Sequence, residues 1–335
     1  MKVDSIKHTF LVSSLEGSET AKNRLDHCVL SYLIGLAPEQ FSSRSQIQRL
    51  IKLGGIRVNG SVVKKTGVQV CSGDKIDVDL SVILDNESQL PDYEIPLNLV
   101  YEDEYLLVID KPADLSMHPG AGNTSKTLLN ALYFHYPELR KQERAGIVHR
   151  LDKDTTGLVV VAKSSHAHHQ LASQFEQRTV QRRYRALCFS TPRGKRLIDQ
   201  QDQGRIETLI SRDNSNKVKM RVSQSEGKRA VTNWTVLQRF SHGVLVELKL
   251  ETGRTHQIRV HLTHIGSSII GDTIYQAPNA LPGPLALAAQ SFGRQALHAF
   301  EIGFFHPNTK KELLFYSEIP PDMQILIDRF KSFKS

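Results

Sequence analysis

The chain has 335 residues, of which 39% are hydrophobic, and it carries a formal net charge of +8. A chain of this length and composition can bury the cores of two domains, which excludes a globally disordered protein. The basic excess favours a polyanionic partner, with nucleic acid first, although a charge that merely keeps the protein soluble explains it equally well.

The cysteines and the apolar segments bear on the compartment. Cys28, Cys71 and Cys188 lie far apart, and their odd number argues against a disulfide framework, so reduced and buried thiols are expected. Residues 1–20 contain no apolar run of the kind found in signal peptides, and no stretch is long and apolar enough to span a membrane. We therefore expect a cytoplasmic protein without membrane contact.

The first folded segment is predicted to begin after an N-terminal extension formed by residues 1–20. Residues 24–33 have the spacing of an amphipathic helix. Residues 43–52 predict a second helix, in which Ser43 and Gln46 have the spacing of a capping box. Three apolar residues of this second helix share one face: Ile47, Leu50 and Ile51.

Strand patterns follow the two helices. Residues 56–58 and 61–63 flank Asn59-Gly60, a pair that favours a tight two-residue turn between antiparallel strands. Residues 75–80 add a further short strand. Residues 21–82 are therefore predicted to form a small basic domain that combines helices with a hairpin.

The order of these landmarks resembles the alpha-L, or S-four-type, RNA-binding domain. The resemblance rests on residues 24–26, 43–45, 56–60 and 73–76. It implies that the domain binds RNA, mainly through contacts to phosphate, whereas the alternative is a merely solvated helix face. The candidate RNA-binding residues are Arg24, Arg44, Arg49, Lys52 and Arg57.

A change in composition marks the next boundary. Residues 83–95 show little periodicity and are predicted to be a linker, followed by a second domain over residues 96–325 and a C-terminal tail over residues 326–335. Strands and helices do not alternate regularly in the second domain, so an α+β class is expected in place of a doubly wound parallel sheet. The predicted strands are residues 97–109, 157–162, 180–188 and 244–250, and the predicted helices are residues 127–136, residues 255–265 and one that Ser164 or Ser165 caps.

Residues 146–158 contain the densest set of charged side chains, with Asp152 and Asp154 among three basic residues between apolar runs. Because an unpaired charge is costly to bury, these groups must be paired or lie in a cleft. The residues alone predict a polar site with a nucleophilic or acid–base Asp, and a structural cluster of ion pairs is an equal alternative. We interpret Asp154 as structural.

The same string closely resembles the signature of the RluA/RluD family of pseudouridine synthases, in which the essential Asp follows His-Arg-Leu and is here Asp152. Residues 111–123, 180–184, 252–262 and 294–299 resemble four further family motifs in the same order. The resemblance implies a catalytic domain with a mixed, largely antiparallel β-sheet flanked by helices. The chain departs from the family pattern at Asp114, Ser116, Met117 and Arg182.

The resemblance implies isomerisation of uridine to pseudouridine in structured RNA by a base-flipping enzyme. Asp152 would attack the sugar, attack the ring or act as a base, and these routes stay open. Tyr184 would lie against the flipped uracil, and Arg259 would pair with Asp152 and keep its carboxylate ionised.

The family also implies residues that bind the substrate. Arg150 would fill the vacated base stack, and Leu297 would close the apolar side of the pocket. Arg254 and Lys111 would contact phosphate, although Lys111 could equally be a solvated strand end. His118, in the first family motif, completes the set of candidate substrate contacts.

The reaction adds no group and changes no oxidation state, so no cofactor and no metal are expected. The histidine cluster at residues 166–169 lacks the ligand spacing of a zinc site. The Gly-Ala-Gly-Asn run at residues 120–123 is typical of the RluD branch and favours large-subunit ribosomal RNA as the partner, with transfer RNA as an alternative, and a monomer is expected. A non-catalytic ribosome-assembly factor and a nucleoside hydrolase that releases uracil are the other functions left open.

Overall fold

The computed structural model describes residues 7–12, 23–36, 44–82, 91–119, 126–190, 197–213, 215–216, 218–275 and 281–333. The chain divides into two compact units, Met1–Pro91 and Asp92–Ser335, and each is described by itself. None of the described helices has the length and apolar character that a bilayer crossing requires. All three cysteines are free thiols, and Cys71 is exposed, so the expectation of buried thiols is wrong for this residue.

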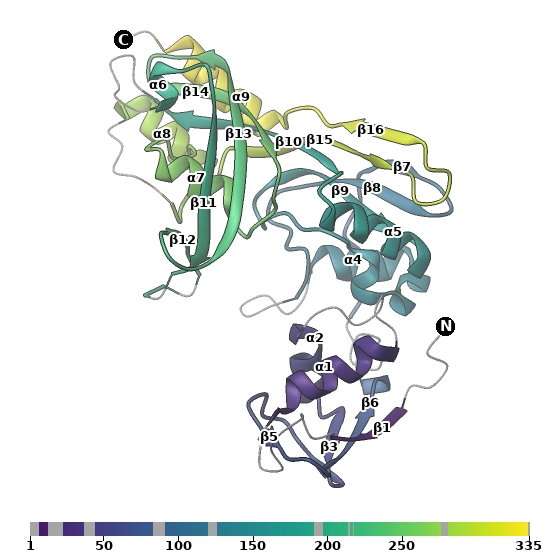
Figure 1. The fold of residues 1–335 in the computed structure, drawn as a ribbon. Coiled ribbons are helices and arrows are strands. Elements are labelled where there is room, and N and C mark those ends of the chain that lie inside the picture. Colours follow the sequence, from purple (N-terminus) through teal and green to yellow (C-terminus); the bar gives the residue numbers. More distant parts are fainter. Residues whose placement is uncertain are drawn as a thin grey trace. The chain divides into compact units, whose positions relative to one another are not determined.

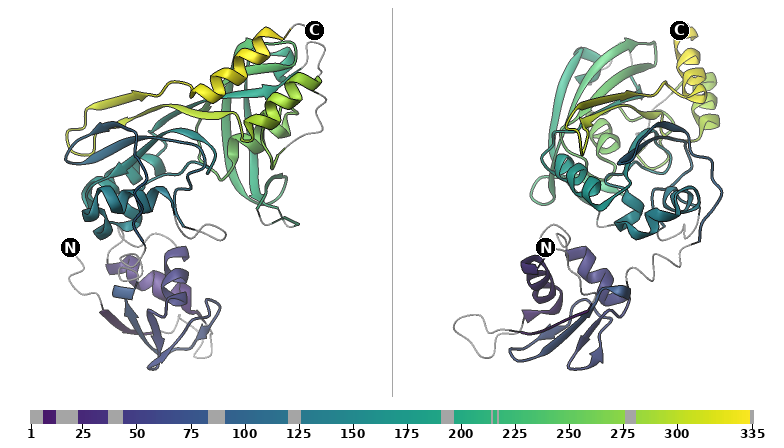
Figure 2. Two further views of the ribbon diagram at one scale, coloured as in Figure 1. Left: turned by 180° about the vertical axis from the view of Figure 1, so that it is seen from behind. Right: turned by 90° about the vertical axis from the view of Figure 1, so that its right-hand side faces the viewer.

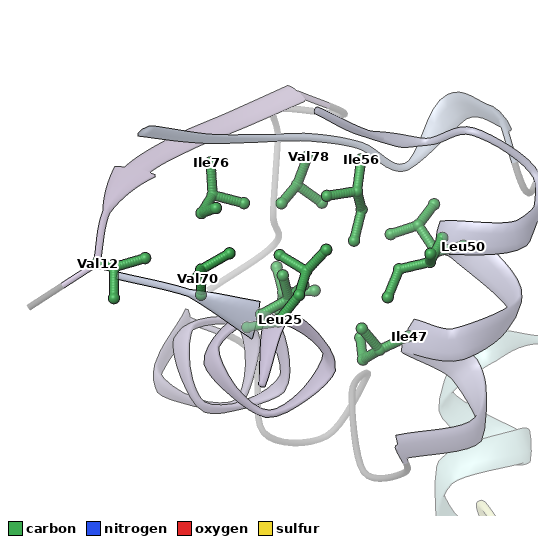
Figure 3. Packing of buried hydrophobic residues seen from close by; sticks show 11 residues of the cluster. Val12, Leu25, Ile47, Leu50, Ile56, Val70, Ile76 and Val78 are labelled. Carbon is green, nitrogen blue, oxygen red and sulfur yellow. The ribbon is translucent and has the colours of Figure 1, made fainter. Parts of the chain in front are cut away.

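The first unit packs two helices, α1 (Leu25–Leu36) and α2 (Arg44–Lys52), against small β-sheets. Four strands form an antiparallel sheet in the order β1-β6-β3-β4, and a separate pair joins β2 (Asn23–Arg24) to β5 (Gln69–Val70). Figure 3 shows how the sheet and the helices turn their apolar side chains toward one another. The core residues labelled there are Val12, Leu25, Ile47, Leu50, Ile56, Val70, Ile76 and Val78.

The predicted N-terminal extension contributes to this unit. Strand β1 (Lys7–Leu11) pairs antiparallel with β6 (Lys75–Asp79) along its whole length, and Val12 belongs to the core. The prediction that residues 1–20 lie outside the domain is therefore wrong for residues 7–12. No residue of this short edge strand is fully buried, because its side chains alternate only between exposed and partly buried positions. Its sequence pattern is therefore too weak to predict a strand.

The predicted hairpin is present as β3 (Ile56–Val58) and β4 (Ser61–Val62). Asn59 and Gly60 both have left-handed backbones, with φ of 49° and 82°, which is the geometry of the tight turn that an Asn-Gly pair favours. The Asn59 side chain also donates to Asp74 and accepts from the backbone N–H of Lys75, which ties the turn to the start of β6. The predicted capping box of Ser43 with Gln46 lies outside the described residues.

The second unit is built on one ten-stranded sheet, in the order β12-β11-β13-β14-β10-β15-β9-β8-β7, with β16 paired to β15. Every pairing is antiparallel except that of β15 with β9, which confirms the predicted mixed, largely antiparallel sheet. Helices α4 (Leu128–His135) and α5 (Ser165–Glu176) lie along the β7–β9 half, whereas α7 (Gln257–His264), α8 (Gly283–Phe292) and α9 (Pro321–Ser332) lie along the other half (Figures 1 and 2). The strands are β7 (Leu99–Glu102), β8 (Leu106–Lys111), β9 (Thr156–Ala162), β10 (Gln181–Phe189), β11 (Gln203–Arg212), β12 (Met220–Ser223), β13 (Lys228–Arg239), β14 (Gly243–Leu250), β15 (Leu297–Phe305) and β16 (Glu312–Tyr316); short helical segments are η1 (Pro137–Lys141), η2 (Glu143–Gly146) and α6 (Leu197–Gln200).

The predicted helices begin where local capping groups allow. Thr127 caps α4 in a capping box with Asn130, and the Ser164 hydroxyl accepts from the backbone N–H of Ala167 at the start of α5. Helix α7 begins at Gln257, two residues later than predicted, because the preceding His256 has a left-handed backbone with φ of 55°. His256 in this turn also lines a pocket of the second unit.

Two local features bring the central strands together. Gly157, with φ of 112°, lets β9 approach β15 so closely that a Cβ atom would lie 2.2 Å from the carbonyl oxygen of Ala299. In β10 the register against β15 shifts between Arg183 and Arg185, so Tyr184 lies at a bulge. The segment before β9, the bulge of β10 and the start of β15 therefore meet at one place.

Residues 321–332 form helix α9, which packs into the second unit, and this corrects the prediction of a tail over residues 326–335. Helix α9 buries one side completely, and its Phe330 lies where a Cβ on Gly243 would clash with the ring at 2.7 Å. Asp322 in its first turn forms an ion pair with Arg294 at 2.9 Å. The buried residues of α9 are Met323, Leu326, Ile327 and Phe330. Their helical spacing spans the predicted boundary, so a boundary at residue 325 divides a single amphipathic helix.

We expect Phe330→Ala to lower the free energy of unfolding of the second unit by about 3–5 kcal/mol, the usual range for truncation of a buried Phe. The single tryptophan of the chain, Trp234, is buried in β13, so its fluorescence in a denaturant titration reports on this unit. The matched control is Ile325→Ala in the same helix, whose side chain is 58% exposed, and it should change the value by less than about 0.5 kcal/mol. Equal and small effects of both substitutions would restore the predicted tail.

Candidate active site

A pocket of about 460 Å³ opens in the second unit beside the segment that precedes β9. Its wall combines that segment with β10, the turn before α7 and the start of β15. Five arginines line it against three acidic residues, so the pocket suits an anionic ligand. These charged residues are Arg150, Arg178, Arg182, Arg254 and Arg259, with Asp152, Glu176 and Glu251.

Asp152 lies in this wall with a side chain that is 17% exposed. Its Oδ2 atom accepts a hydrogen bond of 3.0 Å from Nη1 of Arg259, which α7 presents from 107 residues later in the sequence. The pairing of Arg259 with Asp152 is thus present as the family resemblance implied. A guanidinium at this distance stabilises the ionised carboxylate.

A second carboxylate fixes Arg259. Asp272 accepts from Nε and Nη2 of Arg259 at 2.7 and 2.9 Å, which makes a bidentate pair and leaves Nη1 for Asp152. Burial opposes the charged form of Arg259, but its bonds to Asp272 and the charges of both carboxylates raise its pKa above the ordinary value. Arg259 is therefore a permanent cation that Asp272 orients.

Asp272 is held in turn by the backbone. Burial alone would raise its pKa, but the Arg259 guanidinium and the backbone N–H groups of Ile274 and Tyr275 outweigh burial and keep the pKa below its usual range. The Tyr275 ring also lies 5.0 Å from the Arg259 guanidinium in a cation–π contact. Neither Asp272 nor Tyr275 belongs to a motif from which the site was predicted, so neither residue was among the predicted site residues.

Lys111 connects the segment that carries Asp152 to the residues that follow β8 by hydrogen bonds to backbone carbonyl oxygens. Its ammonium group is fully buried and donates to the carbonyl oxygens of Pro112, Leu115 and Lys153 at 2.7, 3.0 and 2.9 Å. Burial lowers the pKa of Lys111 to about 7, which the nearby Asp154 and Asp152 oppose. Since its donors are used on backbone, Lys111 is not a phosphate contact and not a solvated strand end, which corrects the prediction.

Two residues of the last motif also form hydrogen bonds with the segment that carries Asp152. Arg294 donates to the carbonyl oxygen of Asp154 at 3.3 Å, and Gln295 donates to the Thr155 hydroxyl at 3.1 Å. Asp114 departs from the Gly of the family pattern. Its backbone is left-handed, with φ of 60°, a conformation that Gly adopts most easily and that Asp also tolerates. The Asp114 carboxylate also pairs with Lys153 at 2.7 Å.

The apolar wall consists of Tyr184 and Leu297, both buried at the meeting of β10 and β15. Burial raises the pKa of Tyr184, so its hydroxyl stays neutral. His149 also lines the pocket: its ring stacks on Phe175 at 4.7 Å, and its Nε2 accepts from the backbone N–H of Val160. Burial lowers the pKa of His149 to about 3, which makes it a neutral structural residue.

The remaining predicted site residues divide into two groups. Arg150 and Arg254 line the pocket together with Asp152, as the predictions require. His118 is described but does not line the pocket, and residues 120–123, which end its motif, lie outside the described residues. The pocket is also lined by His256, Arg178 and Arg182, none of which was among the predicted site residues.

The basic residues of the first unit differ in how they are held. Asp26 is fully buried and accepts from both Arg24 and Arg44, at 3.1 and 2.7 Å, and from Gln48. Burial would raise the pKa of Asp26, but these three partners together hold it far below its usual range. Lys52 and Arg57 are exposed, and Lys52 lines a second pocket of about 450 Å³, together with Lys64 and Lys65.

Three or more His, Cys, Asp or Glu side chains in metal-binding proximity do not occur among the described residues.

Comparisons with known proteins match both units. The family model "RNA pseudouridylate synthase" matches residues 105–264, and the model "S4 domain" matches residues 40–76. Curated relatives called "Ribosomal large subunit pseudouridine synthase D" cover most of the chain. The Vibrio cholerae relative is 42% identical over 84% of this chain and 85% of its own length, and the Nitrosomonas europaea relative is 40% identical over 96% and 92%.

Solved structures give the same picture for the fold. The structure titled "Human RNA Pseudouridylate Synthase Domain Containing 4" superposes with a TM-score of 0.54 at 25% identity, over 75% of this chain and 96% of that one. A second human structure, "Human RNA Pseudouridylate Synthase Domain Containing 1", has a TM-score of 0.52 at 23% identity. These matches confirm the predicted fold class.

The buried position of Lys111 predicts a stability defect in place of a binding defect. Lys111→Met should lower the free energy of unfolding by about 2–5 kcal/mol, because three backbone carbonyl oxygens lose the donor that a fully buried ammonium group gives them. The slope of the logarithm of the RNA-binding constant against the logarithm of the salt concentration (the salt slope) should stay unchanged. Arg254→Gln is the converse variant: it should reduce the salt slope by about 0.7–0.9 and leave stability within about 1 kcal/mol. A reduced salt slope in folded Lys111→Met would return Lys111 to the phosphate contacts.

Proposed function

The chain belongs to the RNA pseudouridylate synthase family, and we propose that Asp152 is the residue through which it isomerises uridine to pseudouridine. The observation that carries the proposal is the 3.0 Å bond from Arg259 to Asp152 in a pocket lined by arginines. An ionised carboxylate at such a place can act as a nucleophile or as a base.

The reaction rearranges one nucleoside and leaves its composition unchanged. The bond from the sugar to ring nitrogen 1 breaks, the base turns, and ring carbon 5 forms the new bond to the same sugar carbon. Carbon 5 loses its proton and nitrogen 1 gains one, so the composition stays the same. Asp152 would begin this sequence by attack on the sugar, by attack on the ring or by removal of a sugar proton, and each route requires its anionic oxygen. Hydrolysis would release free uracil, which distinguishes it from isomerisation.

The reaction requires the uridine to leave its stack in folded RNA, because Asp152 lies inside a pocket that a paired base cannot enter. Tyr184 offers an aromatic face for the flipped uracil, and Leu297 closes the apolar side. Arg150 is exposed at the pocket and would fill the stack that the base leaves. Arg254 would bind a neighbouring phosphate.

The substrate we propose is large-subunit ribosomal RNA, since the relatives that cover most of this chain carry that substrate in their names. Transfer RNA is the alternative. The first unit would hold the RNA by phosphate contacts, and the enzyme would act as a monomer in the cytoplasm. The Asp152–Arg259 pair speaks against the reading of the chain as a non-catalytic assembly factor.

Asp152→Asn should abolish turnover while it preserves the fold and RNA binding. Asn keeps the shape and still accepts a hydrogen bond from Arg259, but it lacks the anionic oxygen. We expect a rate loss of at least about ten-thousand-fold, roughly 5.5 kcal/mol of barrier. RNA affinity should change by less than about tenfold, under about 1.4 kcal/mol. Single-turnover formation of pseudouridine, a filter-binding curve and a melting curve measure the three quantities.

The matched control is Asp154→Asn, two residues further along the same segment. The structure ties Asp154 to Arg294 through its backbone carbonyl, a bond that the substitution keeps. The control should therefore retain most of the rate. An active Asp152→Asn beside a folded but inactive Asp154→Asn would transfer the proposed role to Asp154.

Lys52→Gln and Arg57→Gln should each weaken RNA binding without an effect on folding. Both side chains are exposed, so each lost phosphate contact should reduce the log–log salt slope by about 0.7–0.9. Arg24→Gln is the contrasting variant, because it removes two hydrogen bonds to the buried Asp26 and should lower the melting temperature. Unchanged slopes for both exposed variants would exclude this surface as the RNA contact.

A further inference from the structure

His256 lies at the pocket beside Asp152, and none of the roles above uses it. Its side chain is 15% exposed, and its Nε2 atom is 3.9 Å from Oδ1 of Asp152, the carboxylate oxygen that Arg259 does not bind. The left-handed backbone of His256 turns the chain there just before α7. Such a conformation is uncommon for a residue with a side chain and is typical of functional sites.

The hydrogen bonds of Tyr275 favour one of the two neutral tautomers of His256. Oη of Tyr275 accepts from the backbone N–H of Met220 at 2.8 Å and lies 2.7 Å from Nδ1 of His256. The N–H of Met220 can only donate, so the hydroxyl hydrogen is available to Nδ1. When Nδ1 accepts this hydrogen, the proton of the neutral ring is on Nε2, the atom that faces Asp152.

The surroundings of His256 favour the neutral ring. Burial lowers its pKa, and the charge of Asp152 opposes this effect, as does that of Asp272. The charges of Arg259 and Arg150 act in the same direction as burial. A neutral imidazole donates a hydrogen bond and leaves the negative charge of the carboxylate in place, whereas an imidazolium would neutralise it.

We propose that His256 is a positioning residue, which donates its Nε2–H to Oδ1 of Asp152 when uridine binds, while Tyr275 fixes the tautomer. The proposal rests on the proposed role of Asp152. Arg259 on Oδ2 and His256 on Oδ1 then determine the plane of the carboxylate from two sides. The separation of 3.9 Å closes to hydrogen-bond length in the complex, as is common for catalytic contacts that are long in a free enzyme.

Two substitutions of His256 separate the effect of its hydrogen-bond donor from the effect of its left-handed backbone. Asn tolerates the left-handed conformation well but is too short to reach Asp152, whereas Gln places its amide nitrogen near the position of Nε2 at some cost to the backbone. We expect His256→Asn to reduce the single-turnover rate by about 100-fold, as a misplaced catalytic group does, and His256→Gln by about tenfold. Thermal stability should rank the two in the opposite order. If His256 only shapes the turn, the Asn variant will be at least as active as the Gln variant, and the proposal is overturned.

Tyr275→Phe tests the tautomer while the ring over Arg259 remains. Alone it should reduce the rate by about tenfold, and in the His256→Asn background it should cost less than about twofold, because it acts through His256. Additive losses would assign Tyr275 a separate role and remove its link to His256. RNA affinity should stay within about threefold in all variants, since none removes a phosphate contact.

Nitrogen chemical shifts of the ¹⁵N-histidine-labelled full-length enzyme give a readout independent of activity. The His256 signals are identified by their absence in His256→Gln, and near neutral pH they should show a protonated Nε2 and an unprotonated Nδ1. A protonated Nδ1, or a charged ring, would overturn the proposal. The kinetic assays use an unmodified transcript of large-subunit ribosomal RNA, and failure of the wild-type enzyme on it would refute the proposed substrate without touching the nitrogen shifts.

Discussion

The bidentate ion pair between Arg259 and Asp272 is the interaction on which the active site depends. Arg259 is 4% exposed, and a guanidinium at that depth requires a compensating charge. Asp272 supplies the charge, so Asp152 does not have to. The three groups together carry one net negative charge, and that charge remains available at Asp152. If Arg259 had Asp152 as its sole carboxylate, the pair would be neutral and the carboxylate a poorer nucleophile or base.

The rest of the second unit keeps this charge in place. The segment from Asp152 to Thr155 connects to its surroundings through backbone carbonyls and a hydroxyl, which Lys111, Arg294 and Gln295 contact from outside the pocket. None of these braces occupies the Asp152 carboxylate itself. The pocket therefore combines a rigid support with a reactive group that faces a rim of arginines, which suits a ligand that brings its own phosphates.

The sequence was most informative where several neighbouring residues carry a shared function. The string around Asp152, the bulged strand with Tyr184 and the helix with Arg259 were all predicted, together with the class of the sheet. Lys111 was misassigned because a sequence shows the charge of a side chain but not the carbonyl oxygens that fold around it. Asp272 and Tyr275 were missed because their importance comes from contacts with Arg259 and His256 that only the folded chain forms. Strand β15 was not among the predicted strands. It is buried along almost its whole length, so its sequence lacks the alternation of polar and apolar residues that marks a half-buried strand.

The hydrogen bonds between the residues before β15 and the segment before β9 have a consequence for the order in which the enzyme folds. The hydrogen bonds from Arg294 and Gln295 to the Asp152 segment join residues 140 positions apart, and Arg294 is itself held by Asp322 of the final helix. Contacts of such long range form late, because a large loop must close before they contribute. During synthesis the first unit, which has a core of its own, leaves the ribosome before the second unit. The segment around Asp152 lacks these supports until residues 294–322 have followed it. A nascent chain would thus acquire its capacity to bind RNA well before its capacity to modify it.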